Sequence, residues 1–372
     1  MATLKLPYGP DVPLTVPKPD AVATAAGNLY DWITNGTLAD TTPLPSEILH
    51  TAPQTTVHRY IASKKGVAAT RAGKPTILLV PPLAAPATCF DLRRGCSLAE
   101  HFVTRGHPTY LVDYGPIAFS DRRLGLEHWV DKVIPDAIDV ASRDAGTPVH
   151  IVAWCLGGIM SLLAQASRHD LPVASITAIA SPFDVAQVPL IAPLRPIAIR
   201  TGGRVGTAAY RLLGGAPAPL VKRAFQLSSV DKYVTKPLAI LTHLDDRDFL
   251  AQIQAVDKFT SNMLAYPGRT FGQMYHRFMR ENDLADGSID LGNGVISLTD
   301  VTVPVLIIAG NDDVIAPKNA VHHLGDLLPN AREVVLDSAP GGHLGVLTGR
   351  KARSTTWRSI DRFLAKHATA AA

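Results

Sequence analysis

The sequence has few cysteines and no long apolar segment, and each shortage excludes a class of protein. Only three cysteines occur in 372 residues, too few for a disulfide framework, and no two have CxxC spacing. This favours a reducing compartment, and we expect a cytoplasmic protein. The N-terminus lacks the apolar stretch of a secretory signal, and no run of about 18 apolar residues predicts a transmembrane helix.

Charge of either sign is also modest. The chain carries 36 Lys and Arg against 32 Asp and Glu, a formal net charge of +4. No block of basic residues is present, so we expect no nucleic-acid partner. A mildly basic surface can still attract an anionic substrate. With 47% hydrophobic but only 6% aromatic residues, the composition is that of a globular protein whose core is rich in Ala, Leu and Val.

Short apolar runs alternate with helical segments along much of the chain. Runs of this kind are typical of strands that are buried on both faces of a sheet. Strands are expected at 76–80, 109–115, 148–152, 173–180, 305–310 and 332–337, with an edge strand at 56–61. Helices are expected at 21–36, 98–105, 126–143, 159–166, 249–263 and 355–366. This alternation predicts an α/β protein with a doubly wound, mostly parallel sheet.

The rhythm breaks between residues 185 and 300. This stretch begins rich in proline and continues with helical segments, so we interpret it as an inserted, largely helical cap. The predicted core then comprises residues 55–184 and 301–372, preceded by an N-terminal extension, 1–54. Ligands bind at the carboxyl edge of such sheets, and lids that exclude water cover many of these sites. We therefore expect the cap to lie over that edge.

A cysteine stands where a strand meets a helix. Residues 153–158 read Ala-Trp-Cys-Leu-Gly-Gly, between the strand 148–152 and the helix 159–166. Strand, tight turn and helix form the nucleophile elbow of α/β-hydrolases, whose usual string is G-x-S-x-G. Here the string is A-x-C-x-G, so Cys155 takes the place of the serine. A cysteine forms thioesters, which favours acyl transfer over hydrolysis.

An acid and a histidine follow in the order that this fold requires. Asp312 and Asp313 come after the strand 305–310, and His343 follows the strand 332–337 within Gly341-Gly342-His343. We expect Cys155 to be the nucleophile, His343 its base, and a carboxylate to orient the imidazole. Asp313 is favoured as this carboxylate by its G-x-x-D spacing from Gly310. Asp312 is the alternative. If Asp312 is not the catalytic acid, we expect it to be a turn or helix-cap residue.

Backbone N–H groups near the elbow can hold an oxyanion. One donor is expected from Leu156, and a second from Leu83 or Ala84 in the loop after the strand 76–80. Cys89 and Cys96 are expected to be ordinary buried or half-buried thiols. The neighbours His322 and His323 point to different faces of a helix, so we expect no metal site.

These motifs resemble the polyhydroxyalkanoate synthase family, especially the class III catalytic subunits. The likeness covers roughly residues 55–365. Its most specific parts are the elbow and Gly341-Gly342-His343; looser parts are ILLVPPLAAP with CFDL (77–92), Tyr266-Pro267-Gly268 and the stretch 280–284. Carried over residue by residue, the resemblance supports Cys155, Asp313 and His343. The chain departs from the family at Ala153, commonly glycine, where we expect some backbone strain, and at Leu156 and Val314.

The resemblance implies an acyltransferase that polymerises (R)-3-hydroxyacyl-coenzyme A through an acyl thioester on Cys155, with release of coenzyme A. It implies no cofactor or metal, and it implies a homodimer or a second synthase subunit, with some protein on the surface of product granules. An ester or thioester hydrolase on the same fold is the alternative. A non-catalytic accessory protein is a third hypothesis, against which the ordered Cys-Asp-His set argues.

Overall fold

The fold is seen in a computed structural model of the chain. It describes residues 19–61, 73–204, 215–227 and 230–368, together with the short pieces 3–4, 12–13, 207–208 and 210. Most of the Pro-rich segment 1–20 lies outside the described residues.

A central eight-stranded sheet organises the molecule. The strand order is β14-β13-β8-β7-β5-β6-β4-β3. The strands are β3 (Ser46–Ala52), β4 (Thr55–Tyr60), β5 (Thr76–Val80), β6 (Thr109–Asp113), β7 (Val149–Trp154), β8 (Val173–Ile179), β13 (Val305–Gly310) and β14 (Val334–Ala339). Every residue of β5, β7 and β13 is buried, as their continuous apolar runs require. The six strands from β14 to β6 run parallel.

The antiparallel end of the sheet differs from the prediction. The expected edge strand is β4, but β4 pairs with β6 on one side and with β3 on the other, antiparallel to both. The edge is therefore β3, which the sequence analysis missed. Its residues alternate between exposed and half-buried, and Glu47 and His50 interrupt its apolar pattern. Strands at a solvated edge carry a weaker hydrophobic signal than those in the middle of a sheet.

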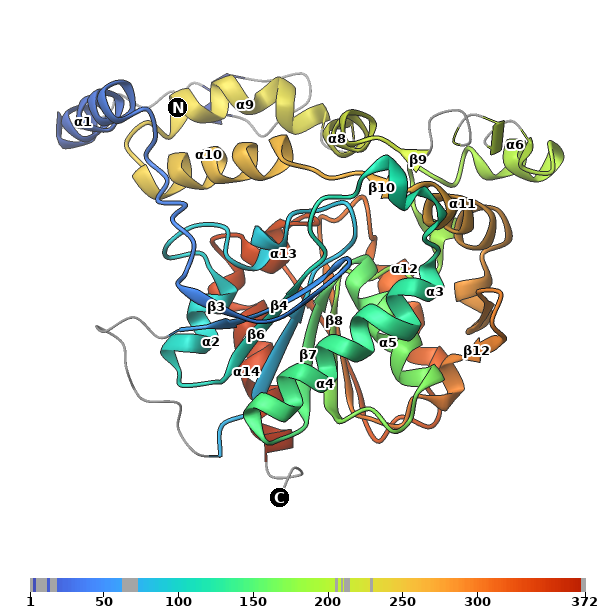
Figure 1. The fold of residues 1–372 in the computed structure, drawn as a ribbon. Helices are drawn as coiled ribbons and strands as arrows, with labels where there is room; N and C mark the ends of the chain where they lie inside the picture. The colour runs from blue at the N-terminus through green and yellow to red at the C-terminus, as the bar shows by residue number, and fades with distance from the viewer. Residues whose placement is uncertain are drawn as a thin grey trace.

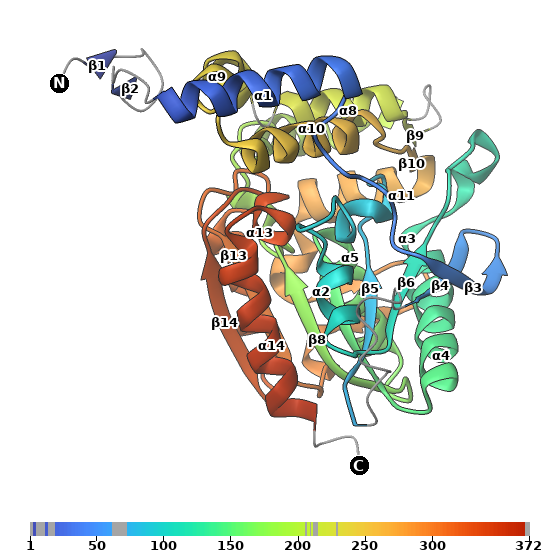
Figure 2. The same ribbon diagram turned by 90° about the vertical axis from the view of Figure 1, so that its left-hand side faces the viewer.

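Helices cover both faces of the sheet, as a doubly wound fold requires. On one face α4 (Ile134–Ala145) packs against α5 (Leu156–Ser167). On the other face lie α2 (Leu98–Thr104) and α14 (Thr356–His367), joined by a hydrogen bond between His101 and Asp361 (Figure 2). The predicted helix 126–143 is one continuous helical stretch, α3 (Leu126–His128), a π-helical turn (Trp129–Val133) and α4.

A second layer of helices lies over one edge of the sheet (Figure 1). It contains α1 (Pro19–Asn35), α6 (Arg195–Arg200), α8 (Ala218–Leu227), α9 (Val230–Thr242) and α10 (Arg247–Ser261). The N-terminal helix α1 joins this layer, because the Asn28 side chain donates a hydrogen bond of 2.8 Å to the carbonyl oxygen of Leu244, between α9 and α10. The predicted N-terminal extension thus contributes one helix to the cap layer and one strand, β3, to the sheet.

The rest of the insertion returns the chain to the sheet. It consists of short elements: β9 (Gly215–Ala216), β10 (Tyr266–Pro267), α11 (Gly268–Gln273), a π-helix (Met274–Glu281), β11 (Ser288–Asp290) and β12 (Val295–Ser297). The smaller helices of the core are α12 (Lys318–His322) and α13 (Gly345–Thr348). Within the part of the chain that the structure describes, no helix combines the length and the apolar character needed to cross a membrane.

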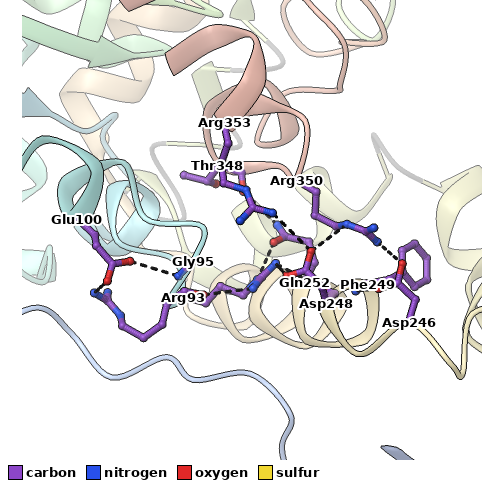
Figure 3. Close-up of polar contacts among 11 residues, drawn as sticks. Arg93, Gly95, Glu100, Asp246, Asp248, Phe249, Gln252, Thr348, Arg350 and Arg353 are labelled. Carbon is purple, nitrogen blue, oxygen red and sulfur yellow. Dashed lines mark hydrogen bonds and ion pairs between the residues drawn. The ribbon is translucent and has the colours of Figure 1, made fainter. Parts of the chain in front are cut away.

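Ion pairs fasten α10 to the core (Figure 3). Arg93, in the loop before α2, is only 4% exposed, and its guanidinium donates to Gln252 Oε1 at 2.8 Å and to Asp248 Oδ1 at 2.9 Å. Arg350, just after α13, pairs with Asp246 at 2.8 Å and with Asp248 at 3.0 Å. The N-terminus of α10 is therefore held by arginines from two separate core loops.

Candidate active site

Cys155 occupies the turn between β7 and α5, in a conformation that few side chains adopt. Its φ is 53° and its ψ is −124°. Backbone in this region is essentially restricted to glycine and costs about 1–3 kcal/mol for other residues, so it persists only where the surroundings impose it. The turn presents the thiol at the N-terminal end of α5, and the Cys155 side chain is half-buried. This is the geometry of a nucleophile elbow.

Two glycines make the sharp turn possible. A Cβ atom on Gly157 would lie 2.4 Å from the carbonyl oxygen of Val80, and one on Gly158 would lie 2.2 Å from Ser181 Oγ. The backbone oxygen cannot move aside, so α5 can approach β5 this closely only with glycine at position 157, whereas a side chain at position 158 would have to displace the Ser181 hydroxyl. The same contact brings the loop after β5 against the elbow.

Ala153 does not carry the strain that its departure from the family pattern predicts. It lies within β7, fully buried, paired with Val80 of β5 and with Ala178 of β8. Regular strand backbone is open to any residue, so alanine fits here without penalty. The expectation at Ala153 was wrong because the unusual backbone conformation is confined to Cys155, two residues later.

Asp313, rather than Asp312, lies against His343. The distance between Asp313 Oδ2 and His343 Nδ1 is 2.8 Å, and both residues are buried. The other oxygen, Oδ1, accepts hydrogen bonds of 2.9 Å from the backbone N–H groups of Ile315 and Ala316. Both carboxylate oxygens are therefore engaged, which fixes the orientation of the carboxylate and, through it, that of the imidazole.

Asp312 has a different task. Its side chain is exposed, and its Oδ2 accepts a hydrogen bond of 3.3 Å from the backbone N–H of Gly341. Its own N–H donates to the carbonyl oxygen of Gly341 at 3.1 Å. Asp312 thus braces the loop that carries His343 without touching the imidazole.

The Cys155 side chain is hydrogen-bonded to His343. Burial alone would lower the pKa of His343, but the negative charges of Cys155 and Asp313 outweigh burial and raise this pKa to about 10. His343 thus lies between the Cys155 side chain and a buried carboxylate, both of which favour its protonated form. The structure thus brings together three of the side chains that the sequence singled out.

The residues proposed to bind an oxyanion lie at the start of α5 and in the loop after β5. Leu156 is the first residue of α5, where N–H groups have no acceptor within the helix. Leu83 and Ala84 lie in the loop after β5; both are buried, and Ala84 has a φ of 63°. The carbonyl oxygen of Ala84 accepts a hydrogen bond of 2.8 Å from Leu264 of the insertion. Their role as oxyanion donors stays a prediction.

A cavity of about 490 Å³ lies between α9 and α10 of the cap layer and the loops that carry the acid and the histidine. Its lining includes Phe249, Ile253 and Val256 from one side of α10, and Asp313 and His343 from the core. The three cap residues recur at intervals of three and four, so they share one face of the helix. An apolar helix face thus looks onto the acid–histidine pair.

Two aromatic residues near the thiol were missed by the sequence analysis. Trp154 precedes Cys155 directly, and its indole contacts His343. Burial, and to a smaller extent the charge of Cys155, raises the pKa of Tyr266. Tyr266 stands in the Tyr-Pro-Gly string, a signal that could have been followed; for Trp154 the only signal was its position beside the cysteine.

The other cysteines and histidines considered in the sequence analysis lie in surroundings that suit a structural role. Cys89 and Cys96 are fully buried, as expected. His322 and His323 each contact a backbone carbonyl oxygen at 2.9 Å, of Asp337 and Ala285 respectively. Across the described ranges, no three His, Cys, Asp or Glu side chains gather closely enough to hold a metal ion.

Comparison with known proteins adds the family. No family model matches the chain. Five curated relatives are all named poly(3-hydroxyalkanoate) polymerase subunit PhaC. The relative from Allochromatium vinosum is 25% identical, over 91% of this chain and 93% of its own length. The relative from Haloferax mediterranei is 23% identical over 78% of this chain, and the match spans only 58% of that longer protein.

Among solved structures, BpoC from Mycobacterium tuberculosis H37Rv matches 86% of this chain and 98% of its own, with 14% identity and a TM-score of 0.50. A likeness at this identity speaks to the fold alone, and together with the strand order it agrees with the α/β-hydrolase fold that the elbow predicts. The resemblance to the polyhydroxyalkanoate synthases that the motifs indicate is thus confirmed over most of the chain, on an α/β-hydrolase fold.

Proposed function

We propose that this protein is an acyltransferase that polymerises (R)-3-hydroxyacyl groups from coenzyme A thioesters. One observation carries the proposal: the thiol of Cys155 lies at a strained elbow, in contact with His343, which Asp313 holds at 2.8 Å. The relatives are named as poly(3-hydroxyalkanoate) polymerase subunits, which supports a 3-hydroxyacyl group as the unit transferred. A cysteine nucleophile suits this chemistry, because exchange of one thioester for another keeps the transfer potential of the acyl group.

In the first half-reaction, the Cys155 thiolate attacks the thioester carbon. The carbonyl oxygen becomes an oxyanion, which the N–H of Leu156 and an N–H from the loop at Leu83 and Ala84 stabilise. Collapse of this intermediate breaks the bond to the coenzyme A sulfur, which takes the proton from His343 Nε2. The products are an acyl thioester on Cys155, free coenzyme A and a neutral His343.

Loss of the thiolate charge prepares His343 for the second half-reaction. The charge of Cys155 is the main influence that raises the pKa of His343, and acylation removes it while burial continues to lower the pKa. The neutral imidazole can then accept a proton from the hydroxyl at the end of a growing chain. That oxygen attacks the acyl-enzyme, the ester forms, and the thiolate–imidazolium pair returns.

Water in place of the chain-end hydroxyl would make the same site a thioesterase. The cavity of about 490 Å³ beside Asp313 and His343 has room for water, so an ester or thioester hydrolase is the second candidate. The choice between them depends on which acceptor reaches His343 beneath the cap layer, because the acylation step is common to both.

The proposal requires no cofactor, since both half-reactions use only side chains and backbone groups of this chain. Coenzyme A enters as part of the substrate. The printed names of the relatives include the word subunit, and we propose that this protein works as a homodimer or with a second synthase subunit. An insoluble product would hold part of the protein at the surface of cytoplasmic granules.

The test is incubation of purified protein with (R)-3-hydroxybutyryl-coenzyme A, with Cys155→Ala as the control. We expect release of free coenzyme A together with insoluble polyester from the wild type alone. Free hydroxy acid without polymer would move the protein to the hydrolase class. Equal release by the wild type and Cys155→Ala would contradict both candidates, because neither works without the thiol.

A further inference from the structure

Trp154 joins the nucleophile strand to the loop that carries His343. It is the last residue of β7, pairs with Ile179 of β8, and is only 1% exposed. Its indole Nε1–H donates a hydrogen bond of 3.1 Å to the backbone carbonyl oxygen of His343. The indole and imidazole ring centroids lie 5.0 Å apart, at an interplanar angle of 41°. Trp154 therefore contacts both the backbone and the ring of His343.

The loop around His343 needs such a restraint. Three of its five residues, Gly341, Gly342 and Gly345, are glycines, and Gly341 has a φ of 128°. Glycine gives the backbone more conformational freedom than any other residue, so a loop of this composition is held by its contacts rather than by its own preferences. Asp313 restrains the imidazole at Nδ1, and the indole restrains the carbonyl group on the same residue.

A buried indole with this geometry is more than a hydrophobic filler. The indole Nε1–H can only donate, and leaving a buried donor without an acceptor is unfavourable. The bond to His343 satisfies the donor and fixes the distance between the end of β7, which carries Cys155, and the histidine loop. On its other side, the indole lies 6.2 Å, centroid to centroid, from Phe259 of the cap helix α10.

We propose that Trp154 is a positioning residue, which sets the alignment of His343 with Cys155. This inference rests on the proposed function of Cys155 as the nucleophile. Trp154 acts through His343 and does not itself take part in proton transfer. Its contact with Phe259 also makes the alignment sensitive to the placement of α10.

The chain offers a matched control for this idea. Trp357 of α14 is 4% exposed, and its Nε1–H donates a hydrogen bond of 2.8 Å to the carbonyl oxygen of Leu347, in α13. Trp154→Phe and Trp357→Phe each remove one buried indole Nε1–H that donates to a backbone carbonyl oxygen. The two substitutions also remove the same side-chain volume. The Trp154 indole bonds to His343, whereas the Trp357 indole bonds to Leu347.

The readout is the rate at which iodoacetamide alkylates Cys155 at pH 6, followed on the Cys155 peptide by mass spectrometry. Only the thiolate reacts, so the rate at pH 6 measures the thiolate–imidazolium pair and needs no substrate. Loss of one buried hydrogen bond predicts a decrease of about five- to tenfold in Trp154→Phe. We expect a similar decrease in the kcat of Trp154→Phe, with its KM within about twofold of the wild-type value. For Trp357→Phe we expect the alkylation rate, kcat and KM all to stay within about twofold of the wild-type values.

Equal decreases in the two variants would overturn the inference, because a purely structural role predicts them. So would an unchanged rate in folded Trp154→Phe. If Trp154→Phe does not fold, Phe259→Leu is the alternative variant, because it removes the aromatic contact of the indole with the cap. We expect a two- to threefold decrease in the rate of Cys155 alkylation at pH 6. No decrease in that rate would overturn the inference. If wild-type Cys155 reacts at pH 6 no faster than a free thiol, the proposed function itself fails. This outcome is seen in the wild type alone, so it is distinct from any difference between Trp154→Phe and Trp357→Phe.

Discussion

The two sides of the candidate site are held in different ways. On the core side, Cys155, Asp313 and His343 lie in the turns that follow β7, β13 and β14, and hydrogen bonds join them. On the cap side, α10 packs on the core through buried residues such as Leu250 and Phe259, and its N-terminus is held in addition by partly exposed ion pairs of Asp246 and Asp248. Breaking an ion pair that contacts water costs little free energy, because water hydrates the separated charges. Breaking buried packing costs more, because the close-packed contacts are lost without replacement. The core side is thus held by buried hydrogen bonds, whereas the N-terminus of α10 relies in part on ion pairs that face water.

The largest effect is expected within the core side, from a matched pair of substitutions. Asp313→Asn keeps the shape but loses the charge that fixes the tautomer of His343, and we expect kcat to decrease by about 10³- to 10⁴-fold. Asp312→Asn, one residue away and exposed, is expected to change kcat by less than about threefold. Steady-state kinetics on purified variants decides this, and equal effects at the two positions would mean that the hydrogen bond to His343 has no catalytic importance.

The next effect contrasts a glycine of the elbow with one of the cap layer. Gly157→Ala forces a Cβ against the carbonyl oxygens of Val80 and Pro81, so we expect a loss of about 3 kcal/mol in the free energy of unfolding. Gly27→Ala places a Cβ on α1 with nothing within 4 Å, and we expect a gain of about 0.5–1 kcal/mol. Urea denaturation measures both. An elbow that tolerates alanine as well as α1 does would contradict the close approach of α5 to β5.

A pH titration sharpens the electrostatic part of the core side. Since the folded pKa of His343 is raised from 6.5 to about 10, its proton stabilises the fold fully below pH 6.5, and this contribution is lost as the pH rises through about 10. In Cys155→Ala the main raising charge is absent, so we expect the pKa of His343 to decrease. Nitrogen-15 NMR of the imidazole, with His343→Gln for assignment, reports both values. An identical pKa in the two proteins would exclude the thiolate–imidazolium pair.

The smallest effect is expected at the junction of cap and core. Arg93→Met removes the buried partner of Asp248 and Gln252, but Asp248 keeps Arg350, so we expect a loss of only about 1–2 kcal/mol. Amide hydrogen exchange should increase at the N-terminus of α10 and stay unchanged in β7. Arg362→Met, on an arginine that is 79% exposed in its ion pair with Asp337, is the control and should leave both unchanged. Faster exchange in β7 would show that the two sides are not separable.

The sequence predicts the core side better than the cap side, for a physical reason. Buried parallel strands such as 76–80 and 305–310 are recognisable in the sequence as apolar runs. The order of Cys, Asp and His can also be read directly from the sequence. The edge strand β3 carries little such signal, because half of it faces solvent. The contacts of Trp154 with His343, and of Arg93 with Asp248, join residues more than 150 positions apart, and no local pattern encodes them.

The choice between Asp312 and Asp313 shows where spacing reaches its limit. Both follow the same strand by two or three residues, and the spacing from Gly310 only favours Asp313. What separates them in the structure is the turn, in which the N–H groups of Ile315 and Ala316 draw the Asp313 carboxylate inward while Asp312 faces outward. That preference belongs to the folded loop, not to either residue.

The central claim is that Cys155 carries the acyl group, and trapping the acyl-enzyme tests it most directly. The protein is mixed with (R)-3-hydroxybutyryl-coenzyme A, quenched with acid within milliseconds and digested, and the peptides are analysed by mass spectrometry. We expect a hydroxybutyryl group on the peptide that contains Cys155, removable by neutral hydroxylamine as a thioester is. Turnover of the substrate with the acyl group on another residue, or with none on Cys155 at any time, would contradict the account.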